Sequence, residues 1–134
     1  MRISTKGRYA LIIMENLANK YHEDRFVRLN EIASEEELSL KYLEKIIPSL
    51  NNKDFFITSR GSDGGYKLKR KPNEYTILEI LEASEGSLAP VECITSNTCN
   101  RKSMCKSIGI WQELDDTINT FLENKTLEDL MEDK

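Results

Sequence analysis

The glycine-rich run Gly61-Ser62-Asp63-Gly64-Gly65 constrains the fold of this chain most, because it can only form a turn. Before it, residues 55–60 (FFITSR) are rich in aromatic and β-branched side chains and predict a strand. After it, residues 66–70 alternate as a returning strand does. The hairpin either has no binding role and is simply exposed to solvent, or it contacts phosphate or a DNA minor groove. Its cations favour the second interpretation; they are Arg60, Lys67, Lys69, Arg70 and Lys71.

Three helices are expected before the hairpin. Residues 4–19 have apolar side chains at helical spacing, and residues 29–34 form a short second helix. A turn at residues 35–38 leads to Ser39, an expected N-cap, and a third helix with an apolar side of Leu43, Ile46, Ile47 and Leu50. We expect Pro48 to kink or shorten this helix. Two short helices and a tight turn followed by a basic hairpin predict a winged helix-turn-helix.

A second group of helices is expected after the hairpin. Thr76 and Glu79 form a capping box that opens a helix to about residue 85, where Gly86 is a plausible stop. Further on, apolar residues recur at steps of three and four, in a helix expected to begin near Lys106: Trp111, Leu114, Ile118 and Phe121. This stripe needs a partner surface, which is either a second copy of the chain or its own head. Thr126 starts a last short helix containing Leu130 and Met131.

The distribution of charge fits a nucleic-acid-binding head joined to a different C-terminal part. The net charge of the 134 residues is −4, but residues 1–71 hold 14 Lys and Arg against 10 Asp and Glu, while residues 72–134 hold 5 against 13. The two parts are therefore +4 and −8. No stretch reaches the roughly 18 apolar residues of a membrane span, so we expect no membrane partner and a cytoplasmic location.

Cys93, Cys99 and Cys105 are the only cysteines and are equally spaced as C-x5-C-x5-C. Six residues along a helix turn a side chain by roughly 240°, so the three thiols can converge only in a loop. Cysteine is often simply a small buried residue, but the polar neighbours of these three offer little hydrophobic core to pack into. A disulfide framework would leave one of the three thiols unpaired. Structural zinc normally takes four ligands at shorter spacing, and His22 is far away in sequence. Compared with these alternatives, the composition favours a redox-active or iron-binding site. Three thiolates suit a soft metal or an iron–sulfur cluster.

Taken together, the segments MRISTKGRYAL, SLKYLEKI, RGSDGGYKL and TLEDL resemble, in the same order, the signatures of the bacterial winged-helix regulators of the IscR/NsrR/CymR family. The cysteine spacing resembles the cluster-binding members of that family. The resemblance implies a homodimer, formed by the long helix, that reads a pseudo-palindromic operator in double-stranded DNA. It places the cluster ligands at Cys93, Cys99 and Cys105, and DNA contacts at Ser39, Lys41, Tyr42, Glu44, Lys45, Arg60 and Gly61.

The chain departs from these relatives at the fourth ligand of the cluster. Ile108 stands where some members have a histidine, and Arg8 stands where others have an aspartate of the first helix. Glu92, a backbone or solvent oxygen, or a small thiol are the candidates that remain, so both a [2Fe–2S] cluster, the expected type, and a [4Fe–4S] cluster stay open. An incompletely ligated cluster suits a sensor better than an electron carrier.

These observations predict a mainly α-helical protein with a small β-hairpin. Its expected parts are a winged helix-turn-helix DNA-binding domain at residues 1–85, a cluster-binding loop at residues 86–106, and a dimerisation helix with a C-terminal helix at residues 107–134. The expected function is a dimeric transcriptional repressor that senses cluster, iron or redox status. The alternative is a cofactor-free regulator controlled by a partner protein or by thiol oxidation. An enzyme with a cysteine nucleophile is disfavoured, because a single histidine leaves it without a nearby base.

Overall fold

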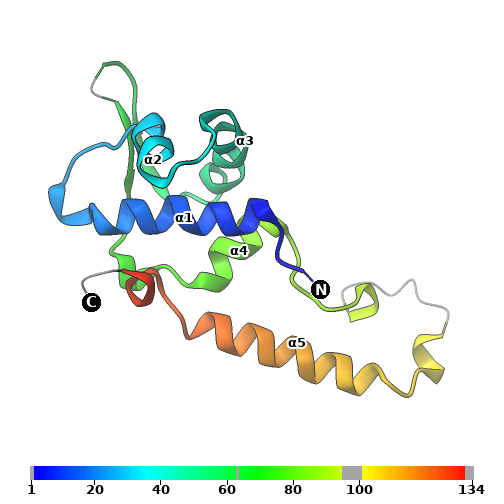
Figure 1. Cartoon of the computed structure of the whole chain (residues 1–134). Helices are drawn as coiled ribbons and strands as arrows, with labels where there is room; N and C mark the ends of the chain where they lie inside the picture. The colour runs from blue at the N-terminus through cyan, green and yellow to red at the C-terminus, as the bar shows by residue number, and fades with distance from the viewer. Residues whose placement is uncertain (1, 63, 95–100, 132–134) are drawn as a thin grey trace.

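A computed structural model describes residues 2–62, 64–94 and 101–131. Figure 1 shows a head made of helices and a hairpin, with one long helix running along the opposite side of the molecule from the hairpin. The described helices and strands are α1 (Thr5–Asn19), α2 (Leu29–Glu36), α3 (Leu40–Asn51), β1 (Phe56–Ser59), β2 (Gly65–Leu68), α4 (Ile77–Glu85) and α5 (Ile108–Glu123). Short 3-10 helices, including η3 (Glu92–Ile94) and η5 (Leu127–Leu130), complete the chain. The expected fold class is confirmed.

The helix-turn-helix is formed by α2 and α3. Helix α2 runs two residues further than the sequence predicted and ends where Glu37 adopts the left-handed conformation, with φ at 56°. Ser39 caps α3 as expected, because its hydroxyl accepts a hydrogen bond from the Tyr42 backbone N–H at 3.3 Å. The expectation that Pro48 shortens α3 is wrong. The helix continues to Asn51, and Leu50, beyond the proline, is completely buried, so core packing outweighs the lost backbone hydrogen bond.

Strands β1 and β2 form the antiparallel wing, with Phe56 opposite Leu68 and Ser59 opposite Gly65. The segment before α2 extends this sheet, because Val27 and Tyr66 exchange two backbone hydrogen bonds of 2.8 Å. Gly65 is required at this contact. Its φ is +140°, and a β-carbon there would lie 2.4 Å from the Val27 carbonyl oxygen. The wing is therefore fixed to the head along one edge.

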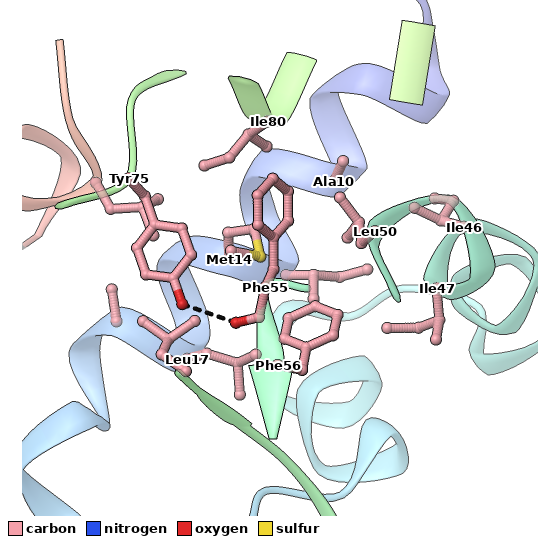
Figure 2. Close-up of a cluster of buried hydrophobic side chains, with 14 of the residues drawn as sticks. Ala10, Met14, Leu17, Ile46, Ile47, Leu50, Phe55, Phe56, Tyr75 and Ile80 are labelled. Carbon is pink, nitrogen blue, oxygen red and sulfur yellow. Dashed lines mark hydrogen bonds between the residues drawn. The ribbon is translucent and has the colours of Figure 1, made fainter. Parts of the chain in front are cut away.

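The core of the head lies between α1, α3, α4 and the base of the wing. Figure 2 shows side chains from all of these segments meeting around Phe55. Tyr75, which is completely buried, stacks edge-on against Phe55 with ring centroids 5.6 Å apart. The core extends to residue 127, because Leu127 of η5 is also completely buried.

Helix α4 begins with the predicted capping box, in which Thr76 and Glu79 exchange hydrogen bonds of 3.0 and 3.1 Å, and it ends at Gly86. Helix α5 begins at Ile108, two residues later than predicted, and contacts α4 and η3. The chain then returns to the head, where the Ile77 N–H donates to the Lys125 carbonyl at 2.8 Å. The last helix is a 3-10 helix that ends at Leu130, so Met131 lies just outside it. Within the described residues, no helix is both long and apolar enough to cross a lipid bilayer.

Candidate DNA-binding surface and cysteine site

The outer face of α3 carries charged side chains that project from the head. Lys41, Glu44 and Lys45 are exposed and form no ion pair with any residue that the structure describes. Tyr42 differs from them, because it is half-buried and its ring packs edge-on against that of Tyr9 in α1, with centroids 5.4 Å apart. Ser39 is exposed at the N-terminus of the same helix. Helix α3 thus presents two cations and one carboxylate to a ligand.

The tip of the wing lies across a groove from α3. Arg60 and Gly61 are both exposed there, and Gly61 has φ at +98°, a conformation that favours glycine. The groove has a volume of about 530 Å³, and both Glu44 and Arg60 line it. The structure therefore brings three of the predicted contact residues, Glu44, Arg60 and Gly61, to one concave surface between α2, α3 and the wing.

Most of the other cations of the wing are engaged within the protein. Lys67 pairs with Asp24 at 2.9 Å, Lys69 with Asp54 at 2.7 Å, and Arg70 with Glu79 at 3.1 Å. The pKa of Asp24 is lowered below its ordinary value because its carboxylate accepts a hydrogen bond from Lys67. These three cations are less available to DNA than the sequence indicated, whereas Arg60 stays exposed without a carboxylate partner among the described residues.

Sequence reasoning missed Arg28, which also lines the groove. Its guanidinium donates a 2.8 Å hydrogen bond to the Gly61 carbonyl and a second bond to the Ser62 carbonyl. Gly61 lies 33 residues further along the chain, so the contact depends on tertiary structure. The only local signal was an arginine directly before the first helix of the helix-turn-helix.

The cysteine region lies at the opposite end of the molecule from the wing tip (Figure 1). Cys93 belongs to η3, which contacts α5, and Cys105 lies three residues before the first residue of α5. Both thiols are half-buried and form no disulfide. Cys99 lies outside the described residues. Within the described part of the chain, no group of three or more metal-binding side chains is gathered.

The surroundings of Cys105 favour the thiolate form of its side chain. The Ser107 hydroxyl lies 3.3 Å from its sulfur, and this contact is the main reason that the pKa of the thiol is lowered below its ordinary value. The backbone N–H groups of Ser107 and Ile108 and the charge of Arg101 act in the same direction. Thiolates are the ligands that iron–sulfur clusters use, so Cys93 and Cys105 are donors of the type that such a cluster requires.

The two positions at which the family resemblance implied a further ligand, Ile108 and Arg8, carry no iron-binding group. Ile108 is the first residue of α5, next to the N-cap residue Ser107, and its alkyl side chain is half-buried. Arg8 is exposed on α1, and its guanidinium donates a 3.1 Å hydrogen bond to the Thr5 hydroxyl. Glu92, the carboxylate among the sequence candidates, lies in η3 beside Cys93.

Helix α5 has no buried residue in the described chain. Trp111, Leu114 and Ile118 are half-buried, while Phe121 and Ile110 are 60% and 62% exposed. Ile118, Phe121 and Leu122 of this helix border an apolar groove together with Ile3 and Leu81. The stripe predicted from the sequence is therefore only partly covered by the chain's own head.

A helix-turn-helix followed by a wing, with charged side chains on the second helix, defines a winged helix-turn-helix DNA-binding protein. Comparison with known families identifies the group of regulators. The model of the Rrf2 family, described as "Iron-dependent Transcriptional regulator", matches residues 3–133. The chain belongs to the Rrf2 family, and it is a transcriptional regulator, not an enzyme.

The relatives have the same architecture over nearly their whole length. CymR of Bacillus subtilis is 36% identical over 130 residues, which is 97% of this chain and 89% of CymR. The solved structure of that protein, named as the global cysteine regulator, has a TM-score of 0.82 and covers 97% of this chain and 95% of its own. IscR of Pectobacterium atrosepticum is 31% identical over 134 residues, which is 100% of this chain and 81% of IscR. The structure of T. potens IscR, 31% identical, has a TM-score of 0.74 and covers 97% of this chain and 85% of its own.

Proposed function

We propose that this chain is a homodimeric transcriptional repressor that acts in the cytoplasm and reads a pseudo-palindromic operator. Its affinity for the operator would be set by an iron–sulfur cluster on Cys93, Cys99 and Cys105. The observation that carries the proposal is the position of Cys105, three residues before α5, a helix that has no buried residue. A change at the cysteine site acts on the start of this helix, which we propose as the dimer seam.

DNA recognition would be divided between α3 and the wing. Lys41, Glu44 and Lys45 would enter the major groove, Ser39 and Tyr42 would lie at the edge of the contact, and Arg60 with Gly61 would reach the adjacent minor groove. Glu44 would contribute to sequence recognition. Phosphate repels its carboxylate, so a carboxylate facing DNA is tolerated mainly where it accepts a hydrogen bond from a cytosine amino group.

The dimer follows from the uncovered side of α5. Its stripe from Trp111 to Phe121 lies partly exposed beside the apolar groove at Ile3 and Leu81. A second copy of the chain presents the same stripe, so an isologous contact would cover both. Two heads held at a fixed separation would then match the two half-sites of a palindrome.

The cluster is supported by the two unbridged thiols, the lowered pKa of Cys105, and the iron-dependent description of the family. When bound, it would supply a redox-active and iron-responsive charge beside α5. A cluster shifts the balance between two arrangements of the heads only by the difference between its affinities for them. The expected type is [2Fe–2S], and [4Fe–4S] is the alternative.

The proposal is tested by purifying the protein without oxygen and measuring its absorbance spectrum, iron and acid-labile sulfide. The same preparation, with and without its cluster, is then titrated with operator DNA. We expect coloured protein whose operator affinity changes when the cluster is removed, and Cys105→Ala should be colourless yet folded. Colourless wild-type protein that binds the operator would support the second candidate, a cofactor-free regulator controlled by a partner protein or by oxidation of Cys105. The similarity to CymR, named as a global cysteine regulator, favours that candidate.

A further inference from the structure

The groove between α2, α3 and the wing contains one cation that the family resemblance does not include. Arg28 directly precedes α2 and is exposed on the wall of the groove near Arg60 and Gly61. Glu44 is the acidic residue that lines the same groove, and the remaining lining side chains are neutral. The groove therefore has an excess of positive charge.

The partners of Arg28 leave its charge uncompensated. Its Nη2 atom donates to the carbonyls of Gly61 and Ser62, which are neutral acceptors, and it forms no ion pair with the residues that the structure describes. Arg25, three residues earlier, is the opposite case. Its guanidinium pairs with Glu23 at 2.7 Å and with Glu31 at 2.8 Å, so two carboxylates neutralise it.

The geometry of the Arg28 side chain also leaves donors available. A guanidinium carries five N–H donors, and the two wing carbonyls engage only the Nη2 atom. The Nε and Nη1 donors have no acceptor among the described residues. An anion with several oxygens can accept them without breaking the bonds to the wing, and phosphate suits this planar fork well.

We propose that Arg28 is a contact to the DNA phosphate backbone that at the same time holds the wing tip in position. The wing carbonyls fix the guanidinium next to the groove that receives DNA, and its free donors and charge bind a phosphate. Because Gly61 is the neighbour of Arg60, the same side chain sets the position from which Arg60 reaches the minor groove. The inference rests on the proposed use of this surface for DNA and adds a residue to it.

The test compares Arg28→Met with Arg25→Met, two variants that remove one arginine each from the same segment. Binding is measured between 50 and 200 mM salt on two duplexes, one with the operator and one with a scrambled sequence. The logarithm of affinity falls linearly with the logarithm of salt concentration, and loss of one phosphate contact makes this fall less steep by about 0.9 for each subunit. We therefore expect Arg28→Met to reduce the steepness of the salt dependence on both duplexes by that amount for each subunit, and Arg25→Met to leave the salt dependence unchanged.

A third variant, Arg28→Lys, separates charge from wing position. It keeps a positive charge but lacks the planar fork, so the slope should stay close to wild type while operator affinity falls, because the wing loses one of its two anchoring bonds. A wild-type slope for Arg28→Met, whatever its affinity, would overturn the inference. Failure of the proposed function gives a different result. Wild-type protein would then bind the operator and the scrambled duplex with equal affinity, while the salt dependence of wild type and Arg28→Met could still be compared.

Discussion

The hydroxyl of Tyr75, two residues before α4, donates a 2.7 Å hydrogen bond to the backbone carbonyl of Phe55, the residue before β1 (Figure 2). The same oxygen accepts from the backbone N–H groups of Lys69 and Arg70, each at 3.0 Å. Burial raises the pKa of Tyr75 above its ordinary value, so the hydroxyl keeps its proton to higher pH. One buried oxygen therefore closes the base of the wing on both strands.

Replacing Tyr75 by phenylalanine should lower the free energy of unfolding by about 1–3 kcal/mol, because it leaves the Arg70 backbone N–H unsatisfied. The Phe55 carbonyl and the Lys69 N–H each lose one bond and keep only the 3.2 Å bond to each other. Urea denaturation measures the loss. Tyr21→Phe is the control, since the Tyr21 hydroxyl makes no hydrogen bond to any described residue. Equal stability of the two variants would show that the hydroxyl does not hold the wing base.

Gly65→Ala should displace the wing from the head. The added β-carbon would lie 2.4 Å from the Val27 carbonyl oxygen, and the φ of +140° is unfavourable for alanine. We expect faster hydrogen exchange at the Val27 and Tyr66 amides and weaker DNA binding. Gly109→Ala, on α5 with open space around its α-carbon, is the matched control. Unchanged exchange at both amides would contradict the close approach.

Acid should weaken the contact between α1 and α2. Hydrogen bonds from Arg25 and Lys20 hold the pKa values of Glu31 and Glu35 below the ordinary value of 4.5. A carboxyl group whose pKa is depressed by folding stabilises the protein above about pH 4.5, and this contribution is lost as pH falls through the lower, folded value. The free energy of unfolding should therefore decline below pH 4.5. In Lys20→Met the free energy of unfolding should decline less steeply with falling pH, whereas in Lys53→Met it should decline as in wild type. An equally steep decline in all three proteins would refute this account.

Ile118→Glu should produce a monomer. The substitution places a carboxylate in the proposed seam of α5, at a cost on the order of several kcal/mol of dimer stability. Sedimentation measures the assembly, and operator binding should be lost with it. Gln112→Glu adds the same charge at an exposed position of the same helix and should remain dimeric. A dimeric Ile118→Glu protein would assign the stripe to the head of its own subunit.

Ile108→His should prolong the life of the cluster. Residue 108 opens α5 three positions after Cys105, so an imidazole there supplies an additional nitrogen donor beside the thiol. We expect the visible absorbance to decay more slowly in air and with a chelator than in wild type. Ile110→His, an exposed position in the same turn, should decay at the wild-type rate. If both variants decay like wild type, another group already fills the fourth position, and Glu92→Ala is the next variant to measure.

The sequence predicted the features that depend on local chemistry. Ser39 and the Thr76–Glu79 capping box identify their helix starts because a cap acts within four residues, and the glycines of residues 61–65 define the wing by their backbone freedom. Features that depend on distant contacts were not predicted. The Lys67–Asp24 pair joins residues 43 positions apart, and Pro48 stays helical because buried neighbours outweigh its missing donor.

The candidate site divides in the same way. The family resemblance implied Lys41, Glu44 and Lys45, and Arg60 was indicated both by the resemblance and by its place in the basic hairpin; the structure leaves all four exposed. Tyr42 could not be placed from local pattern, since its environment is the ring of Tyr9 on another helix. Arg28 escaped for the same reason, because its partners belong to the wing loop.

The return of the chain to the head at Leu127 makes residues 76–126 a closed segment with neighbouring ends. The Thr76–Thr126 bridge and the 3.1 Å bond from the Leu127 N–H to the Tyr75 carbonyl hold those ends together at one point. This segment includes helix α4, whose Ile77, Leu78, Ile80 and Leu81 belong to the core, so replacing it would open the core. Helix α5 is thus anchored on the head from both sides, by α4 before it in the chain and by Leu127 after it, so the part of the chain that carries Cys105 and the DNA-binding head are tied together as one unit.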